Sequence, residues 1–347
     1  MGLVLLALAV VGLAGARYCG RGIQGEYMSI PQTTAIKGIF VVLVFLRHYK
    51  GYVALEGVLD RPFLVLDGKL GQLIVALFLF YSGYGLYESY RKKGRDYVRT
   101  IPKKRFLATL LHFDLAVLLY VLIQAVLMGR FYGWKQILLS LTGWTSVGNS
   151  NWFIFAILVM YLFSWAALRL IPSRVGQLCA VTALSAAYAV VFHHYYPDIW
   201  WWYDTILCYA AGMWFAFFRP QIERFLSGEL RFWVSFGALL VLFRVLFYYR
   251  NSLAVYEALA VVFCLLGVLV SMKVKVGNRV LDWLGRQVFT VYILQRLPMM
   301  LLEQWGLSAY PYAFFAASLA LTLGLAAGFD WLLKRFDRYV LKIPGKK

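Results

Sequence analysis

Long apolar runs separated by short charged connectors repeat from one end of the chain to the other. A run of about 20 apolar residues can cross the hydrocarbon core of a bilayer as a helix. This pattern predicts eleven membrane-spanning helices, near residues 2–16, 35–54, 70–90, 106–128, 152–171, 175–192, 203–218, 230–248, 253–272, 287–306 and 310–333. No hydrophilic stretch is long enough to form a separate soluble domain. We therefore predict an all-α, polytopic membrane helical bundle of about 10–11 transmembrane helices.

The composition excludes a soluble globular protein, because 62% of the residues are hydrophobic and roughly 45–50% is usual for that class. Most of the 35 Lys and Arg residues lie in alternate connectors, chiefly 17–37, 91–105, 219–231, 273–286 and 334–347. Such a bias follows the positive-inside rule. We predict a multi-pass protein of the plasma membrane with its N-terminus outside and its C-terminus in the cytoplasm. The net charge of +19 then reports topology, and the expected partner is the lipid bilayer, not nucleic acid.

The first apolar segment ends in Ala14-Gly15-Ala16, which resembles a secretory signal. It lacks a basic segment before the apolar run and has Arg17 and Arg21 after it, which favours an uncleaved span. We interpret residues 1–32 as an extra N-terminal transmembrane helix with a cytoplasmic linker, and 33–347 as the main membrane domain with a basic cytoplasmic tail. The four cysteines are far apart and form neither a metal-ligand spacing nor a disulfide framework. No histidine and carboxylate pattern of the HExxH type occurs, so we predict no metal.

His48 lies deep inside the predicted span 35–54, roughly 20 Å from its cytoplasmic end at about 1.5 Å per residue. An ionisable side chain is costly in hydrocarbon and commonly marks a functional site. A neutral imidazole at this depth could act as a general base toward a hydroxyl group. The alternative is a structural histidine that is hydrogen-bonded between helices. Asp114, inside the span 106–128, is a candidate to orient His48.

A basic connector, 91–105, ends in Lys103-Lys104-Arg105 at the predicted start of the span 106–128. Cationic side chains together with the free amides of a helix N-terminus could bind an anion such as the phosphates of a nucleotide-bearing donor. A loop that only sets the topology and touches anionic lipid would look the same.

An aromatic segment on the predicted outer side contains Trp200, Trp201 and Trp202. Aromatic rings of this kind can stack on the faces of sugars at an extracellular mouth. An interfacial aromatic belt is the alternative interpretation, because Trp and Tyr gather at the membrane surface.

Five short segments occur in an order that is typical of one family. Lys37-Gly38 is followed by His48 eleven residues after the lysine, and the other segments are Phe78–Tyr84, Lys103–Arg105, Asn151–Ile154 with Trp152, and Leu284-Gly285 with Val291–Gln295. Together they resemble the acyltransferase 3 family of integral-membrane acyltransferases over roughly residues 33–333. The chain departs from the family pattern at Lys37, where Arg is usual, at Ala108, where a second Arg is common, and at Gln295, where His is usual.

The resemblance implies a transferase that takes its acyl group, expected to be acetyl, from cytoplasmic acyl-coenzyme A. The acceptor would be a cell-envelope carbohydrate, such as an exopolysaccharide or a lipid-linked glycan precursor, and the expected reaction is O-acetylation. Acyl-CoA would be a co-substrate, and no bound cofactor is expected.

The resemblance also implies roles for individual residues. His48 would deprotonate the acceptor or carry the acyl group transiently, while Lys37, Lys103, Lys104 and Arg105 would hold the donor phosphates. The acceptor side or cavity would be shaped by Trp152, Gln295, Asp114, Trp200, Trp201 and Trp202.

Two other functions fit parts of the pattern. A transporter or flippase of an anionic or lipid-linked substrate would also be polytopic with intramembrane charges, but it predicts inverted repeats, and none is visible. A catalytically inactive relative is the other alternative, because Gln295 cannot shuttle a proton as His does and Ala108 removes a basic residue. Retention of His48 argues for the enzyme.

Overall fold

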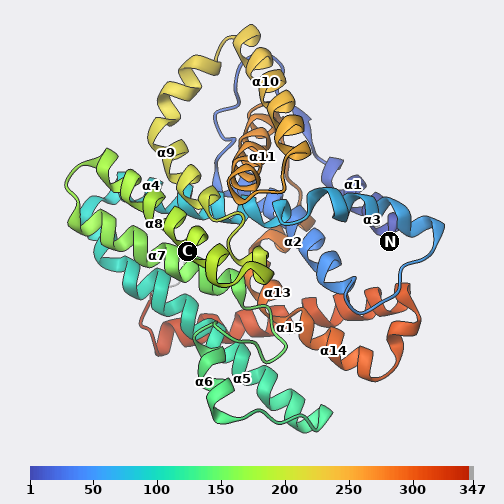
Figure 1. Ribbon diagram of the computed structural model, residues 1–347. Coiled ribbons are helices and arrows are strands. Elements are labelled where there is room, and N and C mark those ends of the chain that lie inside the picture. Colours follow the sequence, from blue (N-terminus) through green and yellow to red (C-terminus); the bar gives the residue numbers. More distant parts are fainter. Residues whose placement is uncertain (344–347) are drawn as a thin grey trace.

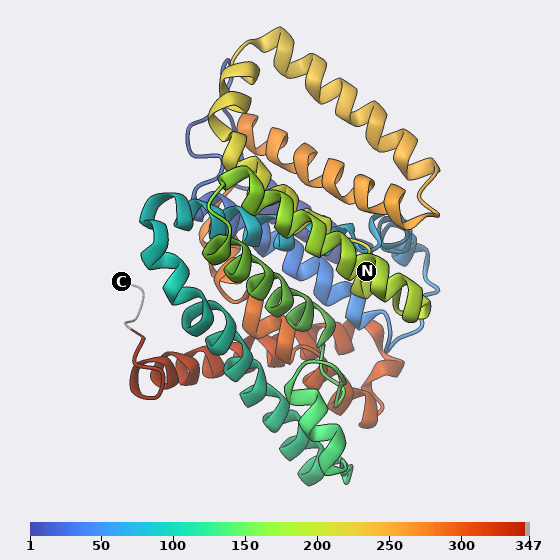
Figure 2. The same ribbon diagram turned by 60° about the vertical axis from the view of Figure 1, so that its left-hand side comes forward.

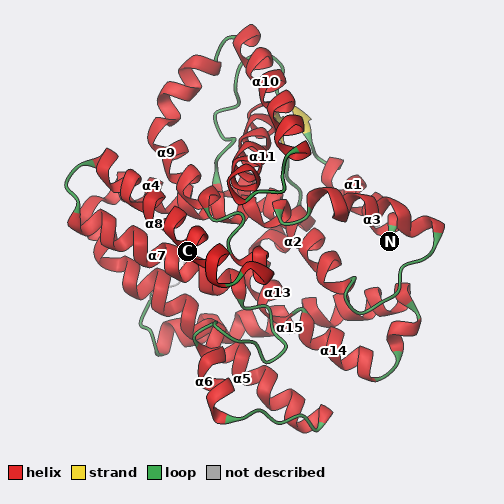
Figure 3. Cartoon of the chain, in the orientation of Figure 1, coloured by secondary structure: helices red, strands yellow, loops and turns green. Residues whose placement is uncertain are grey.

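A computed structural model describes residues 1–343 and is built almost entirely of helices, as Figure 3 shows. The helices are α1 (Gly2–Leu13), α2 (Ile30–Tyr49), α3 (Arg61–Leu70), α4 (Leu73–Ile101), α5 (Ala108–Met128), α6 (Trp134–Leu141), α7 (Trp152–Leu170), α8 (Arg174–Tyr195), α9 (Leu207–Leu226), α10 (Glu229–Tyr248), α11 (Leu253–Lys273), α12 (Arg279–Arg286), α13 (Val288–Leu294), α14 (Arg296–Gln304) and α15 (Pro311–Tyr339). Short helical turns η1 (Val58–Asp60), η3 (Pro197–Trp202) and η4 (Leu307–Ala309) and the π-helical stretch η2 (Pro102–Leu107) complete the helical structure. The strands described are β1 (Arg17–Tyr18) and β2 (Val274–Lys275), which pair antiparallel.

The helices form one bundle (Figure 1). In the turned view of Figure 2, α10 and α11 lie side by side at one edge, and α15 lies at the opposite edge together with α5 and α6. The prediction of an all-α polytopic bundle is confirmed. Of the predicted basic tail, Lys346 and Lys347 lie outside the described residues.

The number of spans differs from the predicted eleven, because seven helical segments within residues 1–343 are long and apolar enough to cross a membrane. One of them, 73–128, is a continuous run that contains two predicted spans and bends at Gly94, whose φ of 60° most residues avoid. The predicted span 2–16 is represented by α1, which has only 12 residues. The second half of α9 contains the charged residues Arg219, Glu223 and Arg224, so α9 falls below the hydropathy of a span.

The predicted span 287–306 is not one regular helix, because it is interrupted at Gln295 between α13 and α14. Pro298 has no N–H to donate to the carbonyl of Leu294, four residues earlier. The hydroxyl of Tyr120 donates to that carbonyl instead, at 3.2 Å. A neighbouring helix thus satisfies the backbone group that proline frees inside the membrane.

Glycines bring two pairs of helices into backbone contact. A Cβ atom at Gly38 of α2 would lie 2.3 Å from the Leu281 carbonyl oxygen of α12, and one at Gly285 of α12 would lie 1.9 Å from the Thr34 oxygen of α2. The pair α4 and α9 uses Gly83 and Gly212 in the same way. Small residues allow such close approach in membrane bundles. The glycines in the segments Lys37-Gly38, Ser82-Gly83 and Leu284-Gly285 therefore hold together the helices around the site described next.

Candidate active site

A cavity of about 760 Å³ lies among α2, α4, α7, α12 and α13. Its outer residues are exposed and come from the linker before α2, from the start of α2, from α4 and from α12: Glu26, Ile30, Lys92 and Arg286. Its inner wall includes the buried side chains of Ile154, Ile157 and Tyr292. The cavity therefore leads from the end of the bundle where α2 begins into the helical core.

One face of α2 lines this cavity. Lys37, Val41 and Val44 are lining residues, and His48 follows Val44 by one further helical turn. Residues spaced by three and four lie on the same face of a helix. His48 is thus on the stripe that the cavity follows, eleven residues beyond Lys37, which is about 16 Å along the helix axis.

The His48 ring packs edge-on against Tyr292, with 6.3 Å between ring centroids and an interplanar angle of 74°. Tyr292 lines the cavity, and its hydroxyl is buried without a hydrogen-bond partner in residues 1–343. Phe153, another lining residue, packs against the Tyr292 ring with 5.6 Å between ring centroids. Tyr292 therefore connects His48 to the inner end of the cavity.

The imidazole of His48 is half-buried, and its ring nitrogens make no hydrogen bond to any described residue. Two guanidinium groups interact with it electrostatically, those of Arg47 and Arg296. Arg47 pairs with Asp67 at 2.8 Å, and Arg296 donates to the Tyr52 hydroxyl at 3.1 Å. His48 itself is not among the residues that line the cavity, and Tyr292 lies between them. No described residue fixes its ring as a hydrogen-bonded structural histidine, which leaves its nitrogens without a protein partner.

Positive charge dominates the lining of the cavity. The cationic lining residues come from α2, α4, η2, α9 and α12: Lys37, Lys92, Arg105, Arg219 and Arg286. The lining carboxylates are Glu26 and Glu88, which pair with Lys275 and Arg91 at 2.9 Å each. The excess of cations over acids suits a ligand that carries several phosphates.

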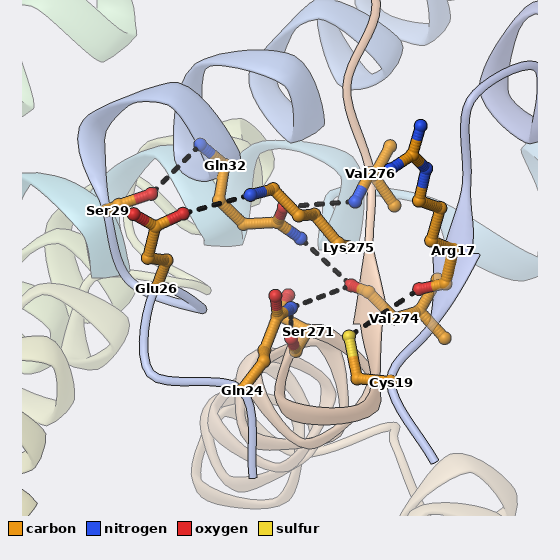
Figure 4. Close-up of polar contacts among 10 residues, drawn as sticks. All are labelled: Arg17, Cys19, Gln24, Glu26, Ser29, Gln32, Ser271, Val274, Lys275 and Val276. Carbon is orange, nitrogen blue, oxygen red and sulfur yellow. Dashed lines mark hydrogen bonds and ion pairs between the residues drawn. The ribbon is translucent and has the colours of Figure 1, made fainter.

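Contacts at the rim join segments that are far apart in the sequence (Figure 4). The side-chain amide of Gln32 donates to the Val274 carbonyl at 3.0 Å, and its oxygen accepts from the Val276 amide at 3.0 Å. Lys275 in the same strand pairs with Glu26. The linker before α2 is thereby fastened to the segment between α11 and α12, and this holds Glu26 at the rim.

The three predicted basic residues at 103–105 separate in the structure. Arg105 lines the cavity, and its Nε donates to the Tyr97 hydroxyl at 3.2 Å. Lys103 and Lys104 are exposed and do not line it. The prediction that a helix begins at Lys103 is wrong, because the helical run resumes directly after the bend at Gly94 and continues through η2 into α5. No free helix N-terminus therefore assists these three side chains.

The predicted residues in the bundle core have different surroundings. Trp152 is buried and packs on Phe153 without lining the cavity. Gln295 is fully buried, its Nε2 donates to the Tyr292 carbonyl at 3.3 Å, and its Oε1 has no partner among the described residues. Gln295 thus contacts the backbone of the residue that touches His48. Asp114 makes no hydrogen bond or ion pair with His48 within residues 1–343, and its Oδ1 is buried without a partner.

The three tryptophans of η3 also separate. Trp202 is buried in an aromatic cluster and stacks on Phe192, with 5.9 Å between centroids and an interplanar angle of 16°. Trp201 packs against Trp200 at 5.8 Å. Trp200 is 43% exposed and lines a second, smaller cavity. Among the three, Trp200 alone offers a ring to a ligand in either cavity.

Sequence reasoning missed Arg219 and Arg286 as candidate donor contacts. Both lie in basic connectors whose charge was read only as a sign of topology. Arg219 is held by the Tyr84 hydroxyl and by Glu223, each at 2.7 Å. The basic connectors therefore supply cavity residues as well as topology, and the clustering of charge in several of them was the available signal.

These features define a multi-pass membrane protein whose bundle contains a positively charged cavity leading toward a half-buried histidine. The family model described as "Acyltransferase domain" matches residues 32–331, nearly the whole chain. The chain therefore belongs to that family, the acyltransferase 3 family, and is a membrane acyltransferase that transfers groups other than aminoacyl groups. A search of curated proteins and a search of solved structures each gave no match.

Proposed function

We propose that this acyltransferase takes an acetyl group from cytoplasmic acetyl-coenzyme A and transfers it to a hydroxyl group of a cell-envelope carbohydrate or of its lipid-linked precursor. The observation that carries the proposal is the cavity, whose cationic lining begins near Lys37 and whose inner end is formed by Tyr292, the ring partner of His48. A volume of about 760 Å³ is within the usual range of small-molecule sites, roughly 300–1,000 Å³.

In this proposal the phosphates of the donor bind at the wide, basic part of the cavity. Lys37, Arg105 and Arg286 are the contacts expected to matter, because each lines the cavity, and Arg105 and Arg286 pair with no carboxylate among the described residues. The pantetheine arm then extends along the Val41 and Val44 face of α2. About 16 Å of helix separate Lys37 from His48, a distance that such an arm can bridge.

The chemistry follows from the position of His48. As a general base, an imidazole nitrogen takes the proton of the acceptor hydroxyl, whose oxygen attacks the thioester carbonyl. The new C–O bond forms, the C–S bond breaks, and the thiolate of coenzyme A leaves with the proton from the imidazole. In the covalent alternative the nitrogen itself attacks the thioester, the C–S bond breaks and coenzyme A leaves as its thiolate. The acceptor oxygen then attacks the acetyl-imidazole, the N–C bond breaks, and the released imidazole nitrogen takes the hydroxyl proton. Both routes need the open ring nitrogens of His48.

We infer the orientation from charge. Lys92, Arg105, Arg219 and Arg286 belong to the connectors richest in Lys and Arg, and such connectors face the cytoplasm under the positive-inside rule. The cavity would then open to the compartment that supplies acetyl-CoA. The plasma membrane is the location that fits an envelope acceptor.

The test compares two single substitutions that remove the same charge. Arg105→Gln is expected to raise the Kd of acetyl-CoA about tenfold to a hundredfold, because a hydrogen bond to a charged group contributes about 1.5–3 kcal/mol. Lys104→Gln, one residue away and exposed, is expected to change Kd by less than about threefold, because an exposed charge is screened by salt. Concentration-dependent thermal stabilisation of the purified protein by acetyl-CoA measures both.

The unfolding midpoint measured without ligand serves as the control that each variant is folded. Arg105→Lys is expected to retain part of the affinity for acetyl-CoA because it keeps the charge. Well-folded wild-type protein that acetyl-CoA and longer acyl-CoA analogues fail to stabilise would refute the proposed donor. Equal losses in Arg105→Gln and Lys104→Gln would refute the cavity as its site.

A further inference from the structure

A second cavity, of about 280 Å³, lies at the end of α2 opposite Lys37. Four segments contribute to it: the last turn of α2, the end of α3 with the turn before α4, η3, and the region where α10 connects to α11. The polar and aromatic lining residues are Arg47, Asp67, Lys69, Trp200, Arg250 and Tyr256. None of them lines the first cavity, so the two cavities are separate.

Cations outnumber acids here as well. The lining carboxylate Asp67 is shared by Arg47 at 2.8 Å and by the adjacent Lys50 at 3.0 Å. Lys69 and Arg250 lie over the Phe247 ring, 5.5 and 3.7 Å from its centroid, and neither pairs with a carboxylate among the described residues. These two side chains are therefore available to a negatively charged ligand.

Two further acids lie close to the cavity, Asp204 and Glu257, and they interact electrostatically with each other. Asp204 is buried and interacts electrostatically with Arg47 and with Tyr256. With Asp204 and Glu257 counted beside Asp67, the four cations around the cavity, Arg47, Lys50, Lys69 and Arg250, still exceed the three acids. The cavity thus retains a net positive charge.

The cavity also offers groups that suit a polyhydroxylated ring. Trp200 presents a half-exposed indole, a surface on which the apolar face of a sugar can stack. The two oxygens of the Asp67 carboxylate each accept from one cation, Arg47 or Lys50, and a carboxylate oxygen can accept one further hydrogen bond, such as that of a sugar hydroxyl. The Tyr256 hydroxyl is held by the Gln72 backbone amide at 3.1 Å. A lipid phosphate needs cations only, so the carboxylate and the indole favour a sugar over a lipid headgroup.

The two cavities approach the same turn of α2. Val44 lines the first cavity and Arg47 lines the second. His48 lies next to Arg47 in the chain, contacts Tyr292 of the first cavity and interacts electrostatically with Arg47. A ligand in each cavity would therefore reach toward His48 from opposite ends of the helix.

We propose that the second cavity is the acceptor site and that it takes an acidic sugar, one that carries a carboxylate or a phosphate group. This inference rests on the proposed function and names the substrate class of the same reaction. Arg47, Lys69 and Arg250 would bind the acidic group, Trp200 would stack on the ring, and the hydroxyl to be acetylated would point toward His48.

The experiment uses the full chain in nanodiscs of phosphatidylcholine, with digalacturonic acid as the acidic probe and cellobiose as the neutral one. Thermal stabilisation by digalacturonic acid is expected, with cellobiose at least about tenfold weaker. The double variant Lys69→Gln/Arg250→Gln is expected to weaken binding of the acidic probe about tenfold or more, since each cation contributes a charge-assisted contact. Stabilisation by acetyl-CoA should stay unchanged, and this also reports that the variant is folded.

A matched variant, Arg130→Gln/Lys135→Gln, removes the same charge from exposed residues that line neither cavity. It should bind the acidic probe as the wild type does. Equal binding of both sugars, or equal losses in the two double variants, would overturn the proposal. Stabilisation by phosphatidylglycerol but not by digalacturonic acid would overturn the proposal in favour of a lipid phosphate site, and stabilisation by inorganic phosphate alone would overturn it in favour of a site for free phosphate. Failure of the proposed function would be recognised by a different result, namely that acetyl-CoA does not stabilise the wild-type protein.

Discussion

Replacement of His48 by Ala is expected to abolish most acetyl transfer while leaving the donor bound. A positioned general acid or base contributes about 10²- to 10⁴-fold to a rate, so kcat should fall by about that factor. The donor contacts lie about 16 Å away along α2, so the Kd of acetyl-CoA should stay within about threefold of the wild-type value. Transfer of radiolabelled acetyl groups from acetyl-CoA to the membrane glycan fraction measures kcat, and thermal stabilisation measures Kd.

The matched control is His194→Ala, which removes an imidazole that is exposed and packs only on the neighbouring Tyr195 among the described residues. This variant should transfer acetyl groups at the wild-type rate. If His48→Ala retains more than about a third of the wild-type kcat, His48 does not perform the chemistry, and another residue of the bundle must do so. Incubation of the wild type with labelled acetyl-CoA in the absence of acceptor distinguishes the general-base route from the covalent route, because only the covalent route leaves an acetyl group on the protein.

The second large effect concerns stability. A Cβ atom at Gly83 would lie 2.0 Å from the backbone oxygen of Tyr209, which no side-chain rotation can relieve. Gly83→Ala should therefore force α4 and α9 apart and destabilise the protein by about 1–3 kcal/mol, the usual cost of overpacking. The apparent unfolding midpoint in detergent measures the loss. Because Ser82 and Tyr84 line the donor cavity, affinity for acetyl-CoA should fall as well.

Gly85→Ala provides the comparison on the same helix. No atom lies within 4 Å of the added Cβ, and alanine is the better helix former by about 1 kcal/mol. Its unfolding midpoint should equal or exceed that of the wild type. Equal midpoints for the two variants would mean that the close contact of α4 with α9 does not hold the bundle together.

The sequence alone determined the class of fold, because transfer into hydrocarbon depends on the local composition of each segment. Runs such as 152–171 and 253–272 therefore predict helices that the structure contains nearly unchanged as α7 and α11. Where a segment mixes polar and apolar residues, local composition predicts less. The second half of α9 and the interrupted α13 and α14 are examples, since tertiary contacts such as that of Tyr120 with Leu294 stabilise them.

The candidate site also consists of residues that the sequence predicts and residues that only the tertiary structure reveals. His48 and Lys37 could be named from the sequence, because the depth of a residue in a helix follows from its number and the rise per residue. Their common face follows from the helical period. Lys103, Lys104 and Arg105 looked equivalent because they are adjacent, yet adjacent helical residues point in different directions, and only Arg105 lines the cavity.

Only the tertiary structure decided which distant segments meet. Arg105, Arg219 and Arg286 reach one cavity because the helices that carry them pack around it, with backbones brought close by Gly38, Gly83, Gly212 and Gly285. The second cavity combines Arg47, Lys69, Trp200 and Arg250 from four separate parts of the chain. Hydrophobicity places a helix in the membrane but does not determine which other helices it packs against, since lipid and protein interiors are similarly apolar. The partners of each helix therefore depend on shape, close packing and hydrogen bonds that only the folded bundle makes explicit.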